Sequence, residues 1–209
     1  FRGQGSEDTK LVEAEPAFLL HGLESRDHML RVIGNLDING DGKSDIIYSS
    51  HNWDQAGSDS LRNRGGFGII LGGRPVEPGK ITVLCKPDYH FWGDRIDAHL
   101  GFSLTKVGDL NNDGCDEFAV GARNHSQGQS RQGQVRVYFG WGETCANKEP
   151  RVVAMAPNLA NTLAGMSLAS NQDMDGDQIP DLVVGSDGYR VGSDTMGAAW
   201  FLPGSYIKS

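Results

Sequence analysis

Three short acidic loops of matching spacing constrain this chain more than any other feature of its sequence. They begin at Asp37, Asp109 and Asp173, and each is followed by a short apolar run. Positions one, three, five and nine of every loop carry acidic or amide side chains. Acidic groups crowded this closely repel one another unless a cation lies among them, and Ca²⁺ prefers oxygen ligands of this kind. The loops therefore predict three calcium sites.

The predicted ligands are the side chains of those four positions and the backbone carbonyl of position seven. In chain order they are Asp37, Asn39, Asp41, Lys43 and Asp45; Asp109, Asn111, Asp113, Cys115 and Glu117; and Asp173, Asp175, Asp177, Ile179 and Asp181. The third loop has Gln178 where the others have glycine, and a non-glycine residue in a left-handed turn costs roughly 1 kcal/mol. We therefore expect the third site to be weaker or distorted, with the additional carboxylate of Asp175 in compensation.

An EF-hand begins with the same acidic spacing, but it requires a glutamate at position twelve of its loop. Tyr48, Val120 and Val184 stand at that position, and none of them binds a cation through its side chain. The residues after each loop also form a short β-branched run and not a helical pattern. Each loop is therefore expected to connect two strands.

The composition favours an all-β protein with many turns, because 29 of the 209 residues are glycine and the apolar runs are short. No apolar stretch approaches the roughly 18–20 residues that cross a bilayer. The formal net charge of −8 argues against nucleic-acid binding, and three bound divalent cations would bring it to about −2. The chain begins at Phe1 and not at methionine, so we expect its original start to have been removed.

The three cysteines are Cys85, Cys115 and Cys145, and the absence of a CxxC spacing argues against a zinc site. Cys115 occupies position seven of the second loop, where the metal needs only a backbone carbonyl. Cys85 and Cys145 are candidates for a disulfide if the compartment is oxidising. The spacing by itself leaves that pairing open.

Short strand-like segments recur along the chain after a polar arm at residues 1–16. A leading strand is predicted at 17–21, within a first unit (17–86) that is followed by a second (87–157) and a third (158–209). The other predicted strands are 29–36, 44–50, 66–73 and 80–86; 102–110, 116–122, 133–140 and 151–157; and 165–174, 180–186 and 197–204. The loops begin 72 and 64 residues apart, and a four-stranded repeat of this length is typical of a β-propeller blade.

Four segments of the second unit carry a more specific pattern: LGFSL at 100–104, VGD at 107–109, FAVGA at 118–122 and GQVRVY at 133–138. Together with the acidic loop they resemble an FG-GAP repeat, the blade of the integrin α-subunit β-propeller. The resemblance covers about residues 17–204, although the first unit lacks the Phe-Gly pair and the third has Gly165-Met166-Ser167 in its place. It implies an all-β propeller with three four-stranded blades in this chain.

Three blades would leave a ring open, because propellers commonly contain four to eight. The leading strand is of the outermost type, and the third unit lacks its fourth strand. Two copies related by a two-fold axis, each lending its first strand to the other's last blade, would form a six-bladed homodimer. The alternative is that further repeats of a longer chain complete the ring.

In integrins, the face opposite the calcium hairpins engages ligands, and the resemblance places candidate binding residues on that face here. The candidates are Trp53, His125 and Tyr189 in equivalent loops, and Tyr89, Phe91, Trp92 and Arg95 in a longer connection. Aromatic rings beside polar groups can stack on sugars or anchor a protein partner. The alternative is that these rings cap the blade cores or line the central channel.

Catalytic patterns such as His-Glu-x-x-His and Gly-x-Ser-x-Gly do not occur in the sequence, so we expect no enzyme activity. The sequence favours a calcium-stabilised, secreted or cell-surface propeller that acts by binding a protein in adhesion or assembly. One alternative is a lectin-like propeller that binds glycans. Another is an accessory domain of a polysaccharide lyase or a phospholipase, because propellers support many functions.

Overall fold

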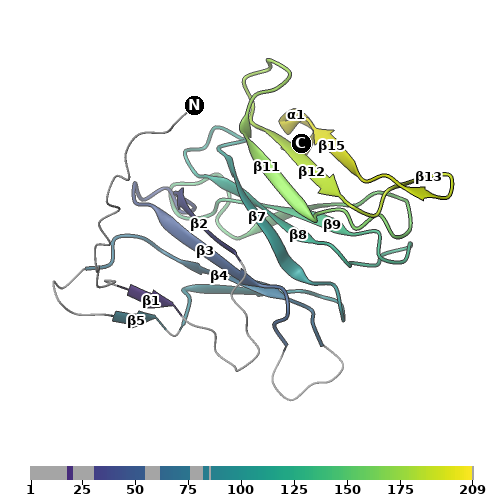
Figure 1. Cartoon of the computed structure of the whole chain (residues 1–209). Coiled ribbons are helices and arrows are strands. Elements are labelled where there is room, and N and C mark those ends of the chain that lie inside the picture. Colours follow the sequence, from purple (N-terminus) through teal and green to yellow (C-terminus); the bar gives the residue numbers. More distant parts are fainter. Residues whose placement is uncertain (1–17, 21–30, 55–61, 76–81, 85, 209) are drawn as a thin grey trace, which may run out of the picture.

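The computed structural model describes residues 18–20, 31–54, 62–75, 82–84 and 86–208, which form an all-β structure (Figure 1). Three antiparallel sheets follow one another along the chain, and β2 and β11 both contact β7 (Figure 1). The first sheet has the order β2 (Arg31–Leu36), β3 (Asp45–Ser50), β4 (Gly66–Ile70) and β6 (Tyr89–Trp92). The second contains β7 (Leu100–Gly108), β8 (Glu117–Ala122), β9 (Gln134–Phe139) and β10 (Arg151–Met155) in that order.

The third sheet contains β11 (Ser167–Gln172), β12 (Asp181–Ser186) and β15 (Ala198–Leu202). A small hairpin, β13 (Arg190–Val191) and β14 (Asp194–Thr195), precedes β15, and the short helix α1 (Gly204–Ile207) follows it. Among the described strands, β15 pairs only with β12, so its outer edge is free of a strand partner. The prediction of a three-stranded third unit is confirmed.

The first sheet differs from the prediction in its fourth strand. We expected residues 80–86 there, but β6 at Tyr89–Trp92 pairs with β4, so the first unit extends beyond residue 86. The predicted segment instead contains β5 (Thr82–Leu84), which pairs in parallel with β1 (Phe18–Leu20). The leading strand, expected to complete another copy, is therefore paired within this chain. Residues 1–16, the predicted arm, lie outside the described residues.

Two hydrophobic cores of the same design lie between the sheets. Phe67 and Ile69 of the first sheet pack against Phe118 and Tyr138 of the second, and the Phe67 and Tyr138 rings meet edge to face at 4.9 Å. On its other side, the second sheet turns Val135, Val137 and Ala119 toward Leu182, Val184 and Trp200 of the third. Alternation along β8 and β9 supplies both faces of this middle sheet, as the two-residue period of a strand requires.

Neighbouring sheets are also joined by a repeated backbone seam. The Leu100 N–H donates to the Arg64 carbonyl at 3.0 Å, and the Ala164 N–H donates to the Gln132 carbonyl at 3.1 Å. Gly65 has a φ of +73°, and a Cβ there would lie 2.1 Å from the Leu100 oxygen, so only glycine fits. The segment that precedes each new sheet is therefore tied to the third strand of the sheet before it.

Candidate metal sites and the opposite face

The three acidic loops share one pattern of hydrogen bonds around the carboxylate at position one. The backbone N–H groups of positions five and six both donate to it. The distances are 3.1 and 2.7 Å at Asp37, 3.0 and 2.9 Å at Asp109, and 3.1 and 2.8 Å at Asp173. The N–H of position seven donates to the carboxylate of position five at 2.9 Å in every loop. The same local geometry is therefore built three times.

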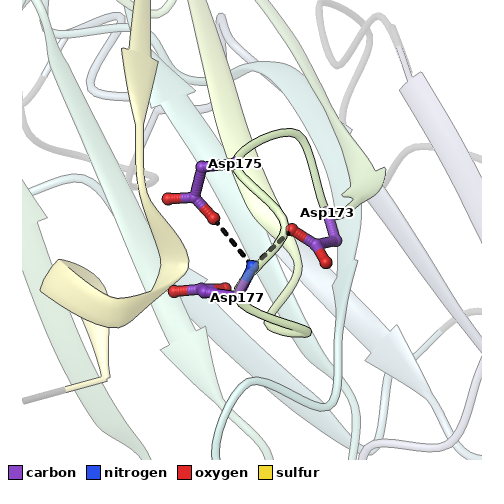
Figure 2. A group of neighbouring side chains, drawn as sticks. All are labelled: Asp173, Asp175 and Asp177. Atoms are coloured by element: carbon purple, nitrogen blue, oxygen red, sulfur yellow. Dashed lines mark hydrogen bonds between the residues drawn. The ribbon is translucent and has the colours of Figure 1, made fainter.

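Three carboxylates of the third loop lie close together. Figure 2 shows Asp173, Asp175 and Asp177 in the same loop, and one carboxylate oxygen from each lies within 4.8 Å of the others. Two oxygens bound to one Ca²⁺ at 2.3–2.6 Å are separated by at most about 5 Å. The donor set and its spacing therefore fit a calcium ion. The first two loops have Asn39 and Asn111 at position three, so an amide replaces one carboxylate there.

The electrostatics of the third loop also favour a cation. The pKa of Asp175 is raised by desolvation and by the neighbouring carboxylates of Asp177, Asp181 and Asp173. A raised pKa means that the charged form is disfavoured in this environment. A divalent cation placed among these groups would remove the repulsion.

The carboxylates at position nine have a second role that the sequence did not predict. They begin β3, β8 and β12 and are buried: Asp45, Glu117 and Asp181. One oxygen of each accepts the N–H of loop position two, and the other accepts an N–H just after the third strand of the sheet. The second group of donors is Gly72 at 2.8 Å, Gly140 at 3.1 Å and Gly204 at 2.8 Å. Burial raises the pKa of Asp45, and it raises that of Glu117 to about 8. Each carboxylate thus links its loop to the rest of the sheet.

The third loop keeps its backbone geometry despite its missing glycine. Gln178 has a φ of +68°, close to +80° at Gly42 and +85° at Gly114. Its N–H still donates to Asp173 at 2.8 Å, as in the other loops. The predicted left-handed turn is present, and the hydrogen bonds of the loop are retained.

The disulfide joins a different pair of cysteines from the candidate pair. Cys115 of the second loop is bonded to Cys145, so Cys145 does not pair with Cys85. Cys85 lies outside the described residues. The pairing depends on how the chain after β9 turns back over the loop, and residue spacing carries no information about that path. A structural disulfide fits an oxidising compartment.

The candidate binding rings do not form one exposed surface. Trp53 and His125 are both 1% exposed, and the Trp53 ring packs against Tyr48, His90 and Trp92. Phe91 is stacked on Phe67 at 4.8 Å, and the half-buried Tyr189 ring meets Trp200 edge to face. Of the seven candidates, Tyr89 and Arg95 are exposed. The interpretation of these rings as blade caps fits the structure better than a stacking surface for sugars.

Polar pockets lie instead at the two junctions between sheets, at the end opposite the acidic loops. One is lined by Asp97, His99, Asn124, Ser126 and Arg131, and the next by Arg131, Asn161, Asp187, Arg190 and Thr195. Burial, with smaller contributions from His51 and Arg123, lowers the pKa of His99 to about 4, so its ring is neutral at pH 7. The sequence did not single out these residues as a site. Asp97, His99 and Asn161 lie just before a new sheet, and the other lining residues named lie in the connections between the second and third strands of a sheet.

Comparison with known proteins agrees with this arrangement. Residues 101–138 match the FG-GAP repeat family. Mouse integrin α-IIb is 29% identical over 175 residues, which is 83% of this chain and 16% of that protein. Human integrin α-IIb is 28% identical over 81% of this chain, and human integrin α-7 is 39% identical over 43% of it. The chain spans about 16% of the length of the α-IIb relatives. Within the described residues, no helix has the length and apolar character needed to cross a membrane.

Proposed function

We propose that this chain, which carries an FG-GAP repeat and is similar to integrin α subunits over most of its length, is a calcium-stabilised binding module that works outside the cell. The observation that carries the proposal is the threefold repetition of one loop geometry, in which the position-one carboxylate accepts the N–H of position five. The Cys115–Cys145 disulfide supports an extracellular or cell-surface location.

Calcium has a structural role in this proposal. Positions one, three, five and nine supply side-chain oxygens and position seven supplies its carbonyl, while the position-nine carboxylate also holds the loop against the third strand. An ion bound there neutralises the crowded carboxylates and fixes the connection between the first two strands of each sheet. Three sites with dissociation constants of about 0.1–1 mM, usual for extracellular modules, would add about 1–4 kcal/mol at 1 mM free calcium.

Removal of calcium tests this role. We expect the melting temperature measured in 1 mM calcium to fall by several degrees in excess chelator, and the fall to be reversed by calcium but not by magnesium at the same concentration. The variant Asp173→Asn/Asp177→Asn, which removes the third site alone, should lose about one third of the increase in melting temperature that calcium causes. An unchanged melting temperature would contradict the assignment of all three sites.

The binding surface is proposed to be the end of the sheets opposite the calcium loops. This end carries the two junction pockets, which combine charged, amide and hydroxyl side chains. Such groups suit a polar protein segment better than a glycan, because the tryptophans expected to stack on sugars are packed into the sheets. A protein partner in adhesion or assembly is therefore favoured over a lectin role.

The ring is proposed to be completed by a second copy of this chain. In matching strand positions, Phe67, Ile69 and their equivalents Val135 and Val137 are at most 2% exposed, whereas Phe201 of the third sheet is 42% exposed. Each of the first two sheets buries this face under the next sheet. The third sheet has no such cover among the described residues, so it offers the surface on which another sheet of the same kind would pack.

A further inference from the structure

A short segment after β9 contacts the second calcium loop at several points. We refer to residues 141–147 as the disulfide turn. Its Cys145 is bonded to Cys115 at position seven of that loop, and its Ala146 N–H donates to the Asp113 carboxylate at 2.7 Å. Asp113 is a predicted metal ligand at position five. The turn therefore holds two of the five ligand positions of the second loop.

The same turn also holds the first calcium loop, which is about one hundred residues away in sequence. The Trp141 N–H donates to the Ile38 carbonyl at 3.0 Å, and the Thr144 hydroxyl donates to the Asn39 carbonyl at 2.9 Å. Gly40 lies directly on the turn, because a Cβ there would be 2.4 Å from the Thr144 hydroxyl and 2.9 Å from the Cys115 sulfur. The turn thus fits between the two loops with little free space.

The two loops are joined directly as well. The Asp37 N–H donates to the Asp116 carboxylate, and the Asp116 N–H donates to the Asp37 carbonyl, both at 2.7 Å. Lys106 donates to the same Asp116 carboxylate and to the Asn35 carbonyl, each at 2.8 Å. Position one of the first loop is therefore in contact with position eight of the second.

The third loop lacks an equivalent of this arrangement among the described residues. Its three central carboxylates are exposed. Where the second sheet continues into the disulfide turn, the third continues into α1. The Gly204 N–H donates to the buried position-nine carboxylate of Asp181, as Gly72 and Gly140 do in the other loops, and Gly204 packs against Pro180. The chain therefore contains two loops held by the turn and one that is not.

We propose that the disulfide turn is a positioning element shared by the first two calcium sites, so that the Cys115–Cys145 bond raises calcium affinity at both of them and not at the third. The inference rests on the proposed calcium sites. A loop that samples many conformations binds with an affinity reduced by the fraction of time it spends in the binding conformation. The turn removes that freedom before the metal arrives, and it couples the two loops because each restrains the same residues.

Site-resolved calcium titration tests the proposal. The position-six N–H bonds the position-one carboxylate in every loop, so the amide signals of Gly42, Gly114 and Gln178 report on the three sites separately by nuclear magnetic resonance. In the Cys115→Ala/Cys145→Ala variant, we expect the dissociation constant to rise at least about five-fold at the first two sites. The third site should stay within about two-fold of the unmodified protein.

A second variant separates positioning from general loss of structure. Thr144→Val keeps the disulfide and removes only the hydrogen bonds to the first loop, so it should weaken the first site more than the second. Thr144→Ser, which keeps the hydroxyl that bonds the first loop, is the matched control and should change no site. If the double-cysteine variant does not fold, Thr144→Val alone decides the question.

The outcomes are distinguishable. Equal weakening of all three sites, or no change in either variant, would overturn the shared positioning element while leaving the calcium sites intact. If calcium shifts none of the three amide signals in the unmodified protein, the proposed calcium function itself fails.

Discussion

At the scale of single residues, the carboxylates of each acidic loop divide into two groups. At positions one and five, and at position three of the third loop, the carboxylates accept hydrogen bonds from backbone N–H groups of the loop, and a cation would neutralise their charge. The one at position nine is buried and has both oxygens bonded to backbone N–H groups from two different elements. The position-nine carboxylate therefore fixes the loop at the start of the second strand, while the oxygens at positions one, three and five remain available for a cation.

The non-glycine residue of the third loop gives a prediction at this scale. Gln178→Gly should raise the free energy of unfolding by about 0.5–1 kcal/mol. The change removes the strain of a Cβ in the left-handed turn, and the greater flexibility of glycine in the unfolded chain offsets part of that gain. The reverse change, Gly42→Gln, should lower it by a similar amount, since no atom of the described residues lies within 4 Å of a Cβ at that position and only the backbone cost remains. Urea denaturation in chelator measures both variants. A fall in the free energy of unfolding for Gln178→Gly, or a rise for Gly42→Gln, would contradict the backbone argument.

At the scale of elements, β6 shows how an aromatic segment serves as an outer strand. Its side chains alternate: Phe91 packs toward Phe67 and Tyr138, while Trp92 lies on the other face beside Trp53. The strand therefore closes two small cores at once. This explains why residues that suggest a binding surface in the sequence are largely covered in the structure.

The role of β6 predicts a stability effect. Phe91→Ala should lower the free energy of unfolding by about 2–4 kcal/mol, since it removes a half-buried ring between two sheets. Ile96→Ala, at a residue 49% exposed just after the strand, is the control and should change stability by less than about 0.5 kcal/mol. Thermal or urea unfolding provides the comparison. A Phe91 variant as stable as the control would argue that the ring serves a ligand and not the core.

At the scale of the whole molecule, the chain repeats one interface and leaves a third copy of it open. The seam carbonyls of Arg64 and Gln132 are occupied by the next sheet, whereas Met196, which stands at the equivalent place in the third sheet, is 68% exposed. An apolar face of this kind favours association. One face of the third sheet is therefore left uncovered by the described residues.

Association through that face gives the last prediction. In calcium buffer, light scattering should find a particle of twice the 22.6 kDa chain mass, and Phe201→Asp should reduce it to a single chain without loss of fold. Val152→Asp is the matched control, because Val152 and Phe201 are both 42% exposed. A single-chain mass for the unmodified protein at all concentrations would contradict the dimer and favour further repeats of a longer chain as the cover.

The features that depend on neighbours along the chain could be predicted from the order of residues alone. The acidic spacing, the left-handed turn at Gln178, the strands on either side of each loop and the FG-GAP pattern are all local, and strand alternation makes them visible in the order of residues. The fold class and the loop geometry follow from those signals.

Which distant segments meet could be learned only from the folded structure. The partner of Cys145, the choice of β6 as fourth strand, the burial of Trp53 and His125, and the second bond of each position-nine carboxylate all depend on contacts across sheets. Such contacts are set by how the turns bring whole strands together, and residue spacing does not encode that path. The physical reason is that packing selects among many locally acceptable arrangements by the apolar area each one buries.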